Sequence, residues 1–232
     1  MATVNTVNTV NTVNIDYFTD VLCIWGYVAQ IRLDELNQQF ANNIEVNEHF
    51  ITLFGNTEKR IQQGWKDKGG YEGFNQHVLH VASQFPHLTV NPNVWITCRP
   101  ASSANSHLYL KAVQLLVAEN TVSKADFYSL IWDVRSAFFK DAKDISQMSI
   151  LSDLAQQLNL PTEAIAEKIN DGSAIAALCA DMEMREQFKL EGSPTYLLNN
   201  GRQKLYGNVG YRVLEANVQE LLERPQGIAS WC

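Results

Sequence analysis

Apolar and polar residues alternate near the N-terminus and then change to helical spacing along most of the chain. The alternation over residues 15–19 and 44–51 is typical of strands. Between them, the segment from Cys23 to about residue 40 has helical spacing and ends at a pair of asparagines. A strand, a helix and a strand in this order predict a β-α-β unit with parallel strands and a right-handed crossover.

Helical spacing continues through the middle of the chain, and strands return near its end. The expected helices cover residues 71–84, 102–119, 124–139, 147–158, 162–170 and 173–188. After them, residues 195–198 and 203–206 read as two strands joined by Asn-Asn-Gly, which is typical of a hairpin turn. A helix over residues 211–222 follows. The predicted order is therefore β-α-β, a helical insertion, and β-β-α.

The first residues form a repeat of Thr-Val-Asn, four times over residues 3–14. A period of three fits neither a helix face nor a strand face, so we expect a disordered tail that packs against nothing, with an interaction tag as the alternative. The predicted division is a tail at 1–14, a domain formed by 15–54 and 190–232, and an inserted helical domain at 55–189.

Composition excludes several classes of partner. The 232 residues are 46% hydrophobic and 19% charged, as in a globular protein, and the net charge of −7 argues against nucleic acid or an anionic membrane. No apolar run reaches the roughly 18 residues of a membrane helix, and no secretory signal is visible, so a cytoplasmic location is expected. The four cysteines lie far apart, which argues against a disulfide framework and a metal site.

The candidate chemistry lies in residues 20–27, Asp-Val-Leu-Cys-Ile-Trp-Gly-Tyr, which place one thiol where a strand ends and a helix begins. Unpaired N–H groups and partial positive charge at a helix N-terminus stabilise a thiolate. We therefore expect the pKa of Cys23 to lie below its usual value of about 8.5, which would make it a nucleophile. The alternative is a buried cysteine that packs as a small apolar residue.

These residues resemble the DsbA-like thioredoxin superfamily, in particular its FrnE-like branch of dithiol–disulfide isomerase relatives. Residues 20–27 are similar to that branch's Asp-x-x-Cys-Pro-Trp-Cys-Tyr, and residues 191–201, Glu-Gly-Ser-Pro-Thr-Tyr-Leu-Leu-Asn-Asn-Gly, are similar to its cis-proline loop and hairpin. The resemblance implies an α/β thioredoxin fold with a large all-helical insertion between the βαβ and ββα halves. Two departures stand out, because Ile24 replaces the usual proline and Gly26 replaces the resolving cysteine.

By this resemblance Cys23 is the expected nucleophile, and the expected substrate-binding residues are Trp25, Gly26, Ser193, Pro194 and Ser103. Without a second cysteine, the expected reaction is monothiol thiol–disulfide exchange, in which glutathione resolves a mixed disulfide. No tightly bound cofactor and no metal are expected. The expected partners are glutathione or a disulfide-containing peptide or protein, and a homodimer is among the expected assemblies because relatives commonly form dimers.

Other interpretations stay open at this point. One is an enzyme similar to kappa-class glutathione transferases or to 2-hydroxychromene-2-carboxylate isomerase, relatives that usually carry serine at the position of Cys23. Another is a non-catalytic module that binds a peptide or a partner in the proline groove.

Cys98 is either a remote resolving thiol or a structural residue, and Cys179 reads as core. Gly26→Cys is expected to create an internal disulfide.

Further polar residues open the helix over residues 102–119. Ser102, Ser103 and His107 are candidates for substrate contacts, with a helix cap and a surface residue as the alternative. Of the histidines, His77 and His80 lie three residues apart on an expected helix, but no third ligand has matching spacing. They therefore read as part of a solvated face.

Overall fold

The computed structural model describes residues 12–224. Its elements, in chain order, are β1 (Val13–Thr19), α1 (Ile24–Phe40), η1 (Ala41–Asn43), β2 (Ile44–Phe50), η2 (Glu58–Gln63), η3 (Lys66–Lys68), α2 (Gly70–Ser83), α3 (Ala104–Ala118), α4 (Lys124–Phe139), α5 (Met148–Gln157), α6 (Thr162–Asn170), α7 (Ser173–Gln187), β3 (Thr195–Leu198), β4 (Gln203–Tyr206) and α8 (Tyr211–Glu223).

One mixed sheet organises the molecule, with strand order β2-β1-β3-β4. β1 pairs in parallel with β2 and antiparallel with β3, and β4 forms the antiparallel edge after the hairpin. Tyr17 in the centre lies beside Glu48 on one side and Tyr196 on the other. This topology confirms the predicted α/β architecture of a βαβ half and a ββα half.

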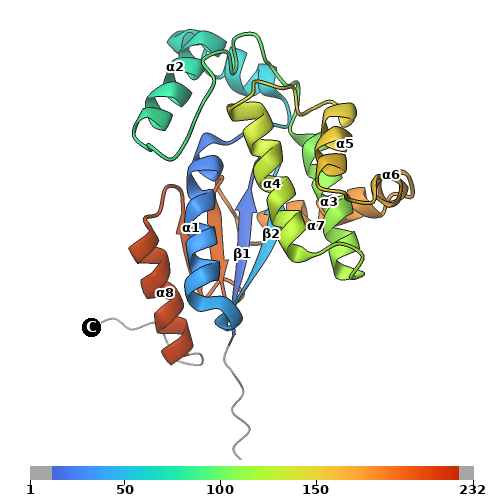
Figure 1. Cartoon of the computed structure of the whole chain (residues 1–232). Helices are drawn as coiled ribbons and strands as arrows, with labels where there is room; N and C mark the ends of the chain where they lie inside the picture. Colours follow the sequence, from blue (N-terminus) through green and yellow to red (C-terminus); the bar gives the residue numbers. More distant parts are fainter. Residues whose placement is uncertain (1–11, 225–232) are drawn as a thin grey trace, which may run out of the picture.

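Helices cover both faces of the sheet (Figure 1). Because successive strand residues point to opposite faces, Ile15 packs with Leu33 of α1 and Leu214 of α8, whereas Phe18 and Leu197 pack on the side of α7. All four residues of β3 are buried, as expected for a strand covered on both sides.

Helices α2 to α7 lie between β2 and β3 and form the predicted helical insertion. α3 lies at its centre, in contact with α4, α5, α6 and α7. Buried residues of the insertion, such as Leu110 and Val113, belong to the same apolar cluster as Val21 and Leu22, which precede α1. The insertion and the strand-to-helix junction therefore share one core.

The structure differs from the sequence prediction in two places. β1 begins at Val13 rather than residue 15, and the Val13 side chain is buried, so the last residues of the Thr-Val-Asn repeat belong to the sheet and not to a tail. Residues 1–11 of the repeat lie outside the described residues. A π-helical turn, η2, and a short 3₁₀ helix, η3, fill a segment for which no element was predicted. Within residues 12–224, no helix is long and apolar enough to cross a bilayer.

Candidate active site

Cys23 is the residue that caps α1 at its N-terminus. Its backbone is extended, with φ −83° and ψ 118°, and its N–H donates to Asp20 O at 3.0 Å. The thiol donates to the carbonyl oxygen of Ser193 at 3.4 Å, and the first N–H groups of α1, those of Trp25 and Gly26, interact with the sulfur. The predicted position of the thiol, between a strand and a helix, is therefore confirmed.

The loop before β3 faces this thiol. Its Ser193–Pro194 peptide bond is cis, as the sequence predicted. The Ser193 hydroxyl accepts a hydrogen bond from Asp20 N–H at 3.0 Å, and Pro194 O accepts one from Gly207 N–H at 2.8 Å. Among the described residues, no hydrogen bond uses the Ser193 N–H. The loop is thus fixed to the start of α1 and keeps one backbone donor for a ligand.

The expected low pKa of Cys23 is wrong. Burial raises the pKa of the thiol, whose residue is only 7% exposed, and the negative charge of Asp20 raises it further. Hydrogen bonds from the Ser193 side chain and from the N–H groups at the start of α1 lower it, but by less. Helix-terminal stabilisation was read from the sequence, whereas burial depends on the insertion packed over the junction.

Asp20 is a fully buried carboxylate directly before the thiol loop. It accepts hydrogen bonds from Leu22 N–H at 2.9 Å, from Phe54 N–H at 2.8 Å and from the Ser103 hydroxyl at 2.8 Å, and His107 Nε2 lies 3.5 Å away. Burial opposes ionisation of Asp20, but His107 and these hydrogen bonds hold its pKa below the ordinary value. The buried Asp20 carboxylate therefore holds the loop before Cys23 in place through its hydrogen bonds.

This arrangement corrects the predicted roles of Ser103 and His107. Both side chains are fully buried, and neither lines the pocket over Cys23. Ser103 supports Asp20, and His107 Nε2 lies 3.2 Å from Val21 N. Their position at the start of α3 was read correctly, but the sequence does not show which side of the junction α3 covers.

Gly26 leaves room that other side chains occupy. A Cβ built on Gly26 would lie 2.7 Å from Thr19 Oγ1 and 3.6 Å from Arg135 Nη2. Arg135, fully buried on α4, donates from Nη2 to Thr19 Oγ1 at 2.8 Å, and that oxygen lies 3.5 Å from Ser193 Oγ. On this backbone a cysteine at position 26 collides with Thr19, so the expected internal bridge does not form without a shift of that residue.

A pocket of about 410 Å³ opens over the thiol. Its lining residues are Cys23, Ile24, Trp25, Leu53, Phe54, Arg60, Gly64, Trp65, Phe74, His77, Glu191, Gly192, Ser193 and Tyr206. Three of the predicted site residues, Cys23, Trp25 and Ser193, meet here. Gly26, Pro194 and Ser103 are not part of the lining.

Sequence reasoning missed the charged and aromatic walls of this pocket. Arg60 and Trp65 come from η2 and the turn after it, in a segment without a clear period, and Glu191 precedes the proline loop. His77, read as part of a solvated face, is half-buried beside Trp65, with ring centroids 5.2 Å apart. The one available signal concerned Glu191, which lies in a loop two residues before Ser193.

Cys98 and Cys179 do not line the pocket. Cys98 is buried, and burial raises its pKa to about 11, which favours the structural interpretation over a resolving thiol. Cys179 is exposed on α7, so the expectation of a core residue was wrong. Cys232 lies outside the described residues. Within the described part of the chain, no group of His, Cys, Asp or Glu side chains is arranged to hold a metal.

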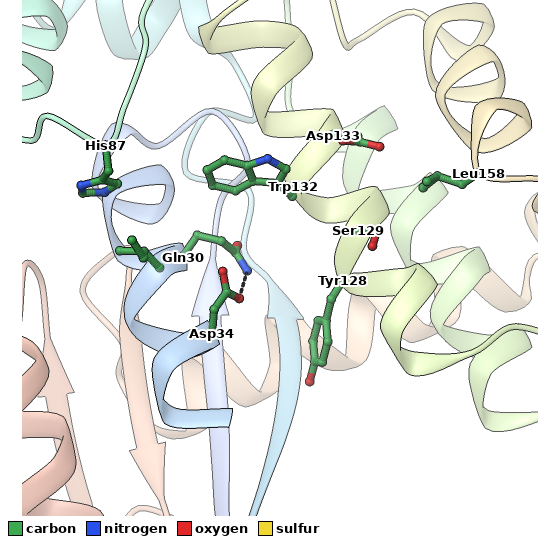
Figure 2. A pocket seen from close by; sticks show the side chains of 9 residues that line it. Gln30, Asp34, His87, Tyr128, Ser129, Trp132, Asp133 and Leu158 are labelled. Carbon is green, nitrogen blue, oxygen red and sulfur yellow. Dashed lines mark hydrogen bonds between the residues drawn. The ribbon is translucent and has the colours of Figure 1, made fainter. Parts of the chain in front are cut away.

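A second, larger cavity of about 630 Å³ lies apart from the thiol, between α1 and α4. Figure 2 shows Gln30 and Asp34 of α1 facing Trp132 of α4 across this groove, with a hydrogen bond between Gln30 Nε2 and Asp34 Oδ1 at 3.4 Å. It contains no thiol. Cys23 and Ser193 line the smaller pocket and not this groove.

A cysteine at the start of α1 opposite a cis-proline loop, on this sheet, matches a known family of domains. The model of the DSBA-like thioredoxin domain covers residues 14–219. The chain belongs to this family. Among curated protein sequences, no match to this DSBA-like protein was found.

Solved structures share the fold of this DSBA-like protein. A protein from Nitrosomonas europaea with a provisional assignment as a protein disulfide isomerase superposes with a TM-score of 0.73 at 16% identity, covering 94% of this chain and 100% of that one. The cytosolic disulfide reductase DsbM from Pseudomonas aeruginosa gives 0.64 at 19%, covering 89% and 98%. The structure of 2-hydroxychromene-2-carboxylate isomerase gives 0.60 at 16%, covering 94% and 100%.

Proposed function

We propose that this DSBA-like protein is a monothiol thiol–disulfide oxidoreductase that uses glutathione as co-substrate and forms a mixed disulfide on Cys23. One observation carries the proposal. Among residues 12–224, Cys23 is the one cysteine that lines the pocket opposite the proline loop, and Thr19 and Arg135 fill the space next to Gly26 where a second thiol would be needed. A DsbM structure with bound glutathione, 18% identical and similar in fold, agrees with the choice of co-substrate.

The proposed reaction has two balanced steps. The Cys23 thiol loses its proton to solvent, and its sulfur attacks the glutathionyl sulfur of a disulfide; one S–S bond forms, the old one breaks, and the released thiolate takes up a proton. The thiolate of a second glutathione then attacks the glutathionyl sulfur on Cys23. This step yields glutathione disulfide and restores the Cys23 thiol, so one glutathione is oxidised with each substrate thiol released.

In the proposed reaction, alignment of the bound substrate compensates for the low thiolate fraction of Cys23. Because burial raises the pKa of Cys23, only a small fraction is ionised near neutral pH. Alignment in the pocket compensates by holding the disulfide against the sulfur, since a bound partner reacts as if at very high local concentration. The Ser193 N–H, which no internal hydrogen bond uses, is the proposed donor to the backbone of the bound peptide.

The test is the release of a peptide thiol from a glutathionylated peptide by reduced glutathione, followed by chromatography. We expect the wild type to catalyse the reaction and Cys23→Ser to fall to the uncatalysed rate, because the nucleophile is lost. Cys179→Ser, at an exposed site, is the matched control and keeps full activity. Loss of activity in Cys98→Ser, with its fold intact, would instead assign resolution of the mixed disulfide to Cys98.

The raised pKa of Cys23 favours a second candidate function. A thiol that stays protonated can donate its S–H to the thiolate of bound glutathione, which then performs addition or isomerisation as in a transferase. This candidate agrees with the similarity in fold to 2-hydroxychromene-2-carboxylate isomerase. The variant Cys23→Ser distinguishes the two functions. It abolishes disulfide exchange, but it keeps a hydroxyl donor and would therefore retain transferase or isomerase activity.

A further inference from the structure

Two side chains of opposite charge, one from the helical insertion and one from the segment before β3, line the pocket of Cys23. Arg60 comes from η2 of the insertion, and Glu191 comes from the segment that leads into β3. Among residues 12–224, no ion pair or hydrogen bond uses either charged group. The pocket of a thiol enzyme therefore holds a cation and an anion that the protein itself leaves unpaired.

Arg60 is an exposed residue, but its guanidinium contacts an aromatic ring. It lies over the ring of Phe54, 4.7 Å from the centroid, and Phe54 is buried and stacks on Trp95 at 5.7 Å. The π-helical backbone of η2, a rare geometry that is frequent at functional sites, carries Arg60 at this position. An arginine held by a ring keeps its N–H donors for a planar anion such as a carboxylate.

Apolar surface lies beside these charges. Trp25, Trp65 and Phe74 line the same pocket, and the rings of Trp65 and Phe74 meet edge to face at 5.0 Å. A volume of about 410 Å³ is within the range of small-ligand pockets. The lining therefore suits a compact molecule with charged ends and a less polar middle.

We propose that the pocket recognises zwitterionic disulfides, namely amino-acid or short-peptide disulfides with a free carboxylate and a free ammonium group. Arg60 binds the carboxylate, Glu191 binds the ammonium group, and the aromatic side chains cover the carbon and sulfur atoms between them. This inference rests on the proposed function of Cys23 and specifies its substrate class.

The experiment compares three disulfides at one site. Oxidised glutathione carries both kinds of charge, cystamine carries ammonium groups alone, and bis(2-hydroxyethyl) disulfide is neutral. We expect Arg60→Gln to slow mixed-disulfide formation with oxidised glutathione by about 10- to 100-fold, the range for a lost charge-assisted hydrogen bond, and to leave the neutral disulfide unchanged. Glu191→Gln slows both oxidised glutathione and cystamine, and Arg60→Lys recovers part of the rate.

Lys59→Gln is the matched control, because it removes the same charge from the neighbouring exposed residue, which does not line the pocket. Equal effects of Arg60→Gln and Lys59→Gln, or an equal effect of Arg60→Gln on all three disulfides, would overturn the inference. Calorimetry with S-methylglutathione, which has the charges but no free thiol, measures recognition without reaction. Binding that depends on Arg60 in a protein that exchanges no disulfide would refute the proposed function and keep the recognition site.

Discussion

At the scale of single residues, Cys23 is subject to opposing influences. The N–H groups at the start of α1 and a hydrogen bond from the Ser193 side chain favour its thiolate, whereas burial and the charge of Asp20 favour the thiol. The effect of burial is the largest, so the pKa of the Cys23 thiol lies above its ordinary value. The residue was identifiable from its sequence context, but its ionisation was not, because the side chains that bury it come from the insertion.

This balance predicts the pH dependence of alkylation. With a pKa above about 8.5, the thiolate fraction of Cys23, and hence its rate with iodoacetamide, rises more than about 20-fold between pH 7 and pH 9. Peptide-level mass spectrometry follows Cys23 separately from the exposed Cys179. A rate that reaches its plateau below about pH 7 would contradict the dominance of burial.

Gly26 provides a second residue-scale prediction. Helix propensity alone predicts that Gly26→Ala, inside α1, stabilises the protein by about 1 kcal/mol. The 2.7 Å contact of its Cβ with Thr19 Oγ1 predicts the opposite sign, a loss of about 1–3 kcal/mol in urea denaturation. In the Thr19→Ala background the loss is smaller, because the colliding oxygen is absent.

The control for this prediction is Gly210→Ala, where a Cβ meets nothing within 4 Å; its effect stays below about 1 kcal/mol. A stabilising Gly26→Ala would show that Thr19 and Arg135 do not occupy the space.

At the scale of elements, a buried network joins the insertion to the sheet. His49 on β2 hydrogen-bonds Asp16 on β1 at 3.0 Å and Asp181 on α7 at 2.8 Å. Asp181 also accepts from Lys111 of α3 at 3.0 Å and from Phe50 N–H at 2.8 Å. Burial lowers the pKa of His49, but the two carboxylates outweigh it and raise the pKa to about 9. A charged imidazole therefore ties three elements together near neutral pH.

The sign of the pH effect follows from this shift. Because the pKa of His49 is about 9 in the folded chain and 6.5 ordinarily, its contribution to stability is complete below about pH 6.5 and is lost as the pH rises through about 9. We expect His49→Gln to lower the free energy of unfolding by roughly 2–3 kcal/mol near pH 6 and by much less near pH 9.5. Urea denaturation at both pH values measures the difference.

His87→Gln, at an exposed site, is the control and shows no such pH dependence. A loss of the same size at both pH values would mean that His49 acts through packing, for example its stack on Phe18, and not through its charge.

The regular helices and strands were predictable because the spacing of apolar residues within each segment indicates its secondary structure. Helices such as α4 and α6 and the hairpin of β3 and β4 follow from spacing, caps and turn residues. The irregular segment at η2 has no period to read, and it supplies Arg60 and Trp65 to the site. Contacts made across the fold were equally invisible, as with Arg135 on α4 reaching Thr19 on β1.

At the scale of the whole molecule, the pocket is formed jointly by the thioredoxin-like segments and the helical insertion. The βαβ and ββα segments provide the thiol and the proline loop, and the insertion provides the wall that carries Arg60 and the aromatic side chains. The same insertion fills the space beside Gly26 through Arg135.

Intact-protein mass spectrometry after exposure to oxidised glutathione tests the central claim, that Cys23 acts as a single thiol. The protein carries Cys179→Ser and Cys232→Ser, which leaves Cys23 and Cys98 as the remaining thiols. The account predicts the addition of one glutathionyl group, mapped to Cys23 and removed by reduced glutathione. An internal disulfide between Cys23 and Cys98, or a glutathionyl group on Cys98 with Cys23 unmodified, would contradict it.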